Sequence, residues 1–207
     1  NPEAVASHFA SYSHHNGASL KGQLKSGRRF VYLARQLDDT AASLIRKRSF
    51  PGVYESREIR RYYPYGSLAG QLIGYTDIDN RGSEGVERSF DRFLGEENGL
   101  ALCFVDAFGN QVPGLLRERT RPREGKSIVL TIDVLFQNIL EEELIRSVTS
   151  AGAESAIGII TEPKTGAILA MANVPRCDPN HAGGVLATIR RNRVVTDPFE
   201  PGSTFKI

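Results

Sequence analysis

The sequence is poor in the residues that bind metals or cross-link a chain. Its 207 residues contain two cysteines, four histidines and no tryptophan. Cys103 and Cys177 lie far apart in the sequence, and neither stands at ligand spacing from a histidine. We therefore expect no metal site and no other cofactor. The two cysteines fit separate small hydrophobic residues better than a disulfide.

The sequence also lacks a strong net charge and a long apolar run. A formal charge of +2 is too small to predict a nucleic-acid partner. No stretch approaches the roughly 18 to 20 apolar residues that span a bilayer. With 40% hydrophobic and 24% charged residues, the composition is that of a folded globular protein. A basic run follows residue 116 and is interpreted as a solvated strand or linker: Arg117, Arg119, Arg121, Arg123 and Lys126.

The most informative segment is Pro201-Gly202-Ser203-Thr204-Phe205-Lys206-Ile207. The Pro-Gly pair predicts a turn that leads into a helix, on which Ser203 and Lys206 lie one turn apart and can meet. A serine becomes a nucleophile when a neighbouring base takes its proton. Lysine is such a base only where burial or nearby positive charge lowers its pKa. A bare S-x-x-K pair is more often a solvated helix start, so the surrounding sequence has to decide.

That surrounding sequence resembles class B penicillin-binding proteins, which are bacterial peptidoglycan D,D-transpeptidases. Residues 191–207 are similar to the active-serine segment of this family. Further matches occur in the family's order at residues 61–74 with 85–91, at 130–133 with Gln137, and at 156–171. The Tyr63-Pro64-Tyr65-Gly66-Ser67 stretch and Gly85-Val86-Glu87-Arg88 are most similar to the division-specific branch.

The resemblance implies an α+β fold in two parts. Residues 1–122 would form a non-catalytic pedestal domain of the dimerisation type. Residues 123–207 would form the start of a transpeptidase domain, an α/β sandwich like that of serine β-lactamases, truncated by the end of the chain at Ile207.

Local patterns predict the elements of these parts. In the first part, helices are expected over residues 2–12, 40–48 and 83–93, a strand over 53–63, and a hairpin with strands 99–107 and 111–117. In the second, a strand is expected over 127–132, a helix from about 134 to 150, and a hairpin with strands 155–161 and 167–173.

The patterns in the second part also predict which side of the helix is buried and where the hairpin turns. On the helix, Leu135, Ile139, Leu140, Leu144 and Val148 form the predicted apolar stripe, so that Glu141 is expected to face away from the core. The hairpin turn is expected at Pro163-Lys164-Thr165-Gly166.

The turn contains Lys-Thr-Gly, which also spells one of the family's motifs. The family order is S-x-x-K, then S-x-N, then K-T-G. Since Lys164-Thr165-Gly166 precedes Ser203, it is interpreted as a turn and not as the catalytic triplet. The true S-x-N and K-T-G motifs are expected outside residues 1–207, so these residues alone are predicted not to be acylated by a β-lactam.

The resemblance further implies function. Ser203 would be the nucleophile and its backbone N–H an oxyanion donor, with Lys206 as general base. Substrates would be peptidoglycan stem peptides, and β-lactams would inhibit. Residues 1–122 would dock other cell-wall synthesis or division proteins. A single-pass anchor in the cell inner membrane, preceding this chain, would place the domains on the periplasmic or extracellular side.

Three alternatives stay open at this point. The first is a serine β-lactamase, which shares S-x-x-K, and the second is a β-lactam-sensing receptor domain. The third is a non-enzymatic docking module of the cell-wall synthesis complex. The choice between division and elongation is also open.

Overall fold

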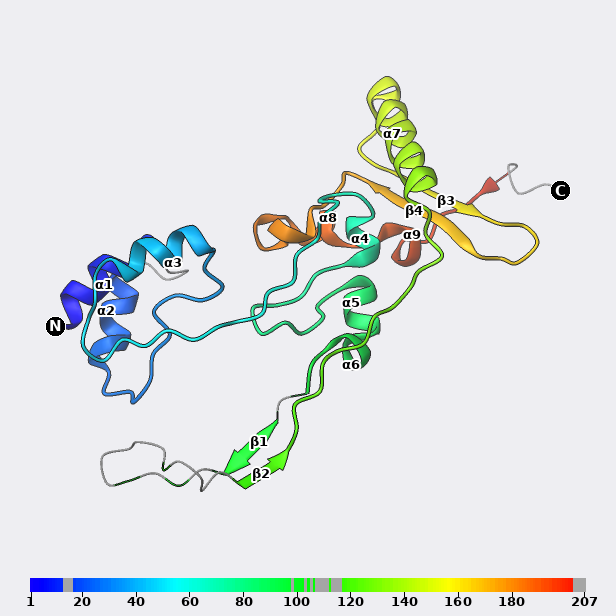
Figure 1. Ribbon diagram of the computed structural model, residues 1–207. Helices are drawn as coiled ribbons and strands as arrows, with labels where there is room; N and C mark the ends of the chain where they lie inside the picture. Colours follow the sequence, from blue (N-terminus) through cyan, green and yellow to red (C-terminus); the bar gives the residue numbers. More distant parts are fainter. Residues whose placement is uncertain are drawn as a thin grey trace. The chain divides into compact units, whose positions relative to one another are not determined.

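The computed structural model describes residues 1–12, 17–97, 99–102, 104, 106, 112 and 117–202. It divides into two compact units, Asn1–Arg60 and Arg61–Ile207, which are described one at a time (Figure 1). The two units are defined by their internal contacts, and a unit defined in this way need not coincide with a domain of a protein family. The domain boundary expected near residue 122 therefore stays a prediction.

The first unit is built from three helices, α1 (Pro2–Phe9), α2 (Gly17–Lys25) and α3 (Asp39–Arg46). Two capping side chains fix where helices begin: Asn1 accepts from the Glu3 N–H, and Asp38 accepts from the Ala41 N–H. Helices were expected over residues 2–12 and 40–48, so α1 and α3 confirm those predictions. The core of the unit lies between α1 and α2 and consists of Val5, Ala6, Phe9 and Leu20.

The strand predicted over residues 53–63 is wrong. These residues are extended, but none is in a strand. Their β-forming side chains reflect a propensity that makes a strand only when another backbone pairs with it. The segment is tied by ion pairs instead, of Arg46 with Glu55 and of Arg35 with Glu58, the latter at 2.8 Å.

The second unit starts with three short helices, α4 (Gly70–Ile73), α5 (Gly85–Ser89) and α6 (Asp91–Leu94). One continuous helix was predicted over 83–93, and this is wrong because the segment forms two helices, α5 and α6. It is interrupted at Phe90, whose φ of −116° and ψ of 20° are not helical. The next residue, Asp91, accepts a hydrogen bond from the Gly82 N–H at 2.7 Å, which ties the start of α6 to the loop before α5.

A hairpin follows, in which β1 (Leu100–Leu102) pairs antiparallel with β2 (Arg117–Thr120). The pairing confirms that a hairpin forms here, but β2 shares only residue 117 with the second strand predicted over 111–117. Residues 108–110, between the two predicted strands, lie outside the described residues, as does Cys103.

The longest helix, α7 (Val134–Ala151), packs on a second antiparallel hairpin of β3 (Ala156–Thr161) and β4 (Ile168–Val174) (Figure 1). Asp133 caps α7 as predicted, accepting from the Leu135 and Phe136 N–H groups at 2.8 and 3.2 Å. The hairpin turn falls at residues 163–165, as expected. The strand predicted over 127–132 is wrong, because these residues are in no strand.

The face of α7 that is buried differs from the one predicted. Leu135 and Ile139 are 74% and 56% exposed, whereas Gln137 is 0% and Glu141 only 2% exposed. The apolar stripe is satisfied only in part, with Leu140 and Leu144 lying over Gly158 of β3. Glu141, expected to face away, is buried because it has polar partners from outside the helix, described below.

The chain continues through the 3₁₀-helix η1 (Pro179–Gly184) and the short helices α8 (Ala187–Arg190) and α9 (Arg193–Thr196). Helix α9 packs against β3 and β4. Helices and antiparallel hairpins thus alternate in the unit, which confirms the mixed α+β class. Within the described ranges, no helix combines the length and apolar character needed to cross a membrane.

Candidate active-site segment

The two predicted site residues, Ser203 and Lys206, lie outside the described residues. Their proposed roles as nucleophile and general base stay predictions. The structure does describe the chain that leads to them, from α8 to Gly202. Gly202 has φ of +57°, in the left-handed region that a Pro-Gly turn favours.

Residues 192–194 of this leading segment are held by β4. Asn173, near the end of β4, donates from Nδ2 to Asn192 Oδ1 at 3.1 Å and accepts the Val194 N–H on Oδ1 at 3.2 Å. Asn192 also points its Nδ2 at Met171 Sδ, 3.4 Å away. The start of α9 is therefore fixed to the strand by side chains.

An ion pair joins the residues that flank α9. Arg191 Nη2 lies 2.7 Å from Asp197 Oδ1 and 2.9 Å from its Oδ2, across the helix. Thr196 donates from Oγ1 to Asp197 Oδ1 at 2.9 Å. Arg191 and Asn192 therefore both form bridges within this segment, Arg191 to Asp197 and Asn192 to β4.

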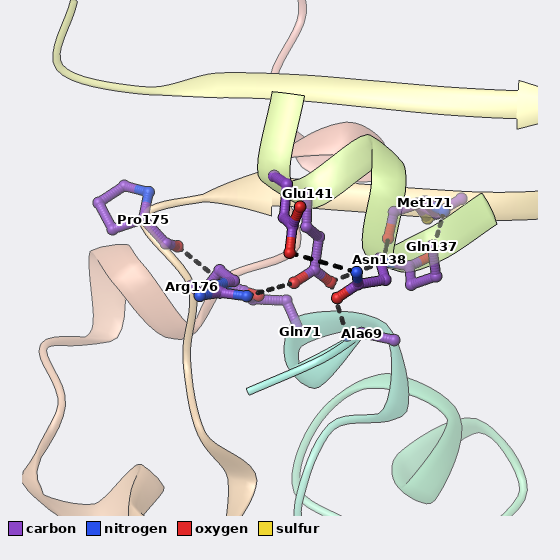
Figure 2. Close-up of polar contacts among 9 residues, drawn as sticks. Ala69, Gln71, Gln137, Asn138, Glu141, Met171, Pro175 and Arg176 are labelled. Atoms are coloured by element: carbon purple, nitrogen blue, oxygen red, sulfur yellow. Dashed lines mark hydrogen bonds and ion pairs between the residues drawn. The ribbon is translucent and has the colours of Figure 1, made fainter. Parts of the chain in front are cut away.

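A buried polar network lies on the other side of β4, between α7 and residue 69 (Figure 2). Gln137 forms a two-point contact with the Met171 backbone, donating to its O at 2.9 Å and accepting its N–H at 2.8 Å. The same amide donates to Glu141 Oε1 at 2.8 Å, and this oxygen also accepts the Ala69 N–H at 2.7 Å. Arg176 Nη1 lies 3.3 Å from Glu141 Oε2 and balances the buried charge.

The network joins two of the segments that carried the family resemblance. Ala69 stands in the first match and has φ of +53°, while Gln137 stands in the second. Gln71, two residues on, donates to the Pro175 and Ile189 carbonyls at 2.7 and 3.1 Å. Residues 69–71 are thus bound to the strand-and-helix core that carries the Ser203 segment.

A second contact region involves Tyr63. Asn180 donates to the Tyr63 O at 2.9 Å and accepts its N–H at 3.0 Å. The Tyr63 hydroxyl lies 3.3 Å from Glu87, a buried carboxylate that also pairs with Arg61. Burial and the Glu87 charge raise the pKa of Tyr63 to about 12, so its hydroxyl stays protonated at neutral pH.

Cys177 is buried, and burial raises the pKa of its thiol, which favours the protonated form. Lys164 and Thr165 lie in the exposed hairpin turn, as predicted. Across the part of the chain that the structure describes, no group of histidine, cysteine and carboxylate residues could hold a metal ion.

Sequence reasoning missed Asn173, Gln137 and Glu141 as organising residues. One signal was present for Asn173: a lone asparagine ending an apolar strand has to find hydrogen-bond partners when buried. The partners themselves, residues 192 and 194, follow only from the fold.

The S-x-x-K pair that follows this helix-covered hairpin in the sequence is a motif of serine β-lactamases and penicillin-binding proteins. Comparison with family models defines the chain further. Residues 2–130 match the penicillin-binding protein dimerisation domain, and residues 156–207 match the penicillin-binding protein transpeptidase domain. The chain belongs to the penicillin-binding proteins, with the domain order of class B that the sequence predicted.

Individual relatives agree. The chain is 39% identical over 178 residues to the peptidoglycan D,D-transpeptidase FtsI of Escherichia coli K12, covering 86% of this chain and 30% of the relative. It is 38% identical over 189 residues to the probable peptidoglycan D,D-transpeptidase PenA of Neisseria meningitidis, covering 90% of this chain and 32% of the relative. The chain thus spans about a third of the length of these relatives.

Among solved structures, penicillin-binding protein 3 of Mycobacterium tuberculosis complexed with ampicillin is similar. The TM-score is 0.55 with 30% sequence identity, and the match covers 69% of this chain and 28% of that one.

Proposed function

We propose that the protein containing this chain is a peptidoglycan D,D-transpeptidase that cross-links stem peptides through an acyl-serine intermediate and is inhibited by β-lactams. Its relatives carry the name peptidoglycan D,D-transpeptidase, and one solved neighbour binds ampicillin. Because this chain spans only part of their length, the activity is assigned to the complete protein and not to residues 1–207.

The proposal rests mainly on one observation, which is that the segment before Ser203 is anchored to β4 by side chains. Residues 191–197 are tied to β4 by Asn173 and closed by the Arg191–Asp197 pair. A nucleophile has to be held within a fraction of an ångström of its productive position. A solvated helix start, the ordinary reading of S-x-x-K, needs no such anchoring of the chain that precedes it.

The proposed chemistry proceeds in two halves. Lys206 Nζ takes the proton of the Ser203 hydroxyl as Oγ attacks the carbonyl carbon of the penultimate D-Ala. The Ser203 N–H donates to the developing oxyanion, and the terminal D-Ala leaves with a proton on its amine. The amine of a neighbouring stem peptide then attacks the ester, forming the cross-link and returning the proton to Ser203 Oγ. A β-lactam acylates the same oxygen by ring opening.

Location and partners follow from the same assignment. We propose that the protein is held in the cell inner membrane by a single-pass anchor, with its domains on the periplasmic or extracellular side. A division role is favoured by the FtsI and PenA relatives. Residues 1–122 are proposed as the docking surface for other cell-wall synthesis or division proteins.

The test is acyl transfer from a thioester analogue of a D-Ala-terminated peptide to a free D-amino acid, by the complete protein. We expect a new peptide bond to form with wild type and none with Ser203→Ala. Hydrolysis without transfer, together with rapid turnover of a chromogenic cephalosporin, would identify a β-lactamase. A stable acyl-enzyme that transfers nothing would identify a β-lactam receptor. No reaction by the folded protein would leave the docking module as its function.

A further inference from the structure

We infer that Asn173 is a positioning residue for the Ser203 nucleophile, acting through Asn192 and Val194. The inference rests on the proposed function and adds a determinant that lies outside the S-x-x-K motif. It is supported by four features of the described residues: the burial of Asn173, its paired hydrogen bonds, the unused cap of α9 and the ion pair that closes this helix.

Asn173 is 4% exposed, and both ends of its amide are used on one short stretch of chain. Oδ1 accepts from the Val194 backbone, and Nδ2 donates to the Asn192 side chain. Because an amide carries a donor and an acceptor at fixed separation, this contact sets both the distance and the rotation of residues 192–194 relative to β4. A hydrophobic residue of the same size supplies neither.

Asn192 provides an independent observation. It is the N-cap residue of α9, a position where asparagine normally accepts from the helix's own N–H groups. Here its side chain makes no cap hydrogen bond and is directed at Asn173 and Met171 instead. The side chain therefore gives up local helix stabilisation for a link to the strand.

The Arg191–Asp197 pair makes this link effective further along the chain. Asn173 holds the start of α9 on β4, and the ion pair joins the residues that flank this helix, so residues 191–197 are held at both ends. Only residues 198–202 separate this segment from Ser203. We expect a shift of the α9 start relative to β4 to reach the nucleophile through these residues, where a misplacement of about 1 Å costs on the order of 100-fold in rate.

The experiment compares Asn173→Leu with Asn180→Leu in the complete protein. Asn180 is a matched control, because it also makes two hydrogen bonds to one backbone, that of Tyr63, away from the Ser203 segment. The second-order rate constant for acylation by a fluorescent penicillin and the melting temperature are measured for each variant. We expect both variants to melt earlier, but only Asn173→Leu to be acylated about 10- to 100-fold more slowly.

A double-mutant cycle covers the case in which Asn173→Leu does not fold. Asn173→Asp keeps the acceptor for Val194 but loses the donor to Asn192, and Asn192→Asp keeps the acceptor for Asn173 but loses the contact with Met171, so each single change is expected to slow acylation only in part. The double change places two carboxylates where the amides now lie 3.1 Å apart. It is expected to slow acylation at least about tenfold beyond the product of the single effects.

Each outcome is decisive. Slow acylation confined to the Asn173 variant, or strong coupling in the cycle, supports the inference. Equal slowing by Asn173→Leu and Asn180→Leu, or normal acylation of the Asn173 variant, overturns the positioning role while wild-type acylation still supports the proposed function. If folded wild type is not acylated at all, the proposed function is overturned and the positioning role falls with it.

Discussion

Replacing Glu141 by alanine should loosen the junction between residues 66–73 and β4. The Glu141 carboxylate is 2% exposed and accepts from the Ala69 N–H and from Gln137, with Arg176 beside it (Figure 2). Alanine leaves the Ala69 N–H buried without a partner, at about 1–3 kcal/mol. It also removes one buried methylene, worth about 0.8 kcal/mol. Because Arg176 is partly exposed and can be solvated when its partner is lost, the expected loss is the sum of these two contributions, about 2–4 kcal/mol.

The assay is hydrogen–deuterium exchange of the complete protein, read on peptides covering residues 66–73 and 169–174. Since about 1.4 kcal/mol corresponds to a tenfold change, exchange in the first peptide should accelerate at least about 25-fold. Glu141→Gln keeps an oxygen for Ala69 and loses only the charge opposite Arg176, so it should cost about 1–2 kcal/mol.

Glu142→Ala is the matched control on the same helix. Glu142 is exposed and lies 3.9 Å from Arg146, a surface pair that contributes little. Its replacement should change stability by less than about 0.5 kcal/mol. If Glu141→Ala exchanges no faster than Glu142→Ala, the buried network does not hold residues 66–73 and the reasoning is refuted.

Three further predictions follow from single residues. A Cβ on Gly70 would lie 1.9 Å from the Cys177 carbonyl oxygen, so Gly70→Ala should lower the stability measured by thermal denaturation by about 1–3 kcal/mol or more. A Cβ on Gly183 meets open space, so Gly183→Ala should leave the stability unchanged. Equal melting temperatures of the two variants would contradict this. The pKa of Tyr63 is raised from 10.0 to about 12 by burial and by Glu87, so its stabilising contribution is fully present below pH 10 and lost as pH rises toward 12. The melting-temperature difference between wild type and Tyr63→Phe should shrink over that interval, and a constant difference would show that Tyr63 does not titrate there. Residues 1–207 alone should form no adduct with penicillin in intact-mass analysis, because the S-x-N and K-T-G motifs that would desolvate Lys206 are expected outside them; labelling at Ser203 would contradict this.

Sequence reasoning predicted features whose causes are local. The Asp133 cap of α7 and the β3–β4 hairpin with its Pro163–Gly166 turn depend on residues that are neighbours in the sequence. The strands expected over 53–63 and 127–132 failed because β-propensity says nothing about whether a partner strand is available.

The larger miss was Glu141. Helical periodicity places a glutamate outside an apolar stripe in solvent, and that inference assumes no polar partner inside. The partners, Ala69 and Arg176, are distant in sequence and meet α7 only in the folded chain. The same applies to Asn173 and its contacts with residues 192–194. Ser203 and Lys206 were predicted from a motif and its family context, which are both properties of the sequence.

The most direct test of the central claim is the intact mass of the complete protein after incubation with penicillin, beside Ser203→Ala. We predict one covalent adduct per wild-type molecule, located at Ser203 by peptide mapping, and none in the variant. A folded wild-type protein without an adduct, or an adduct that survives the Ser203→Ala change, would contradict the assignment of Ser203 as the acylated nucleophile.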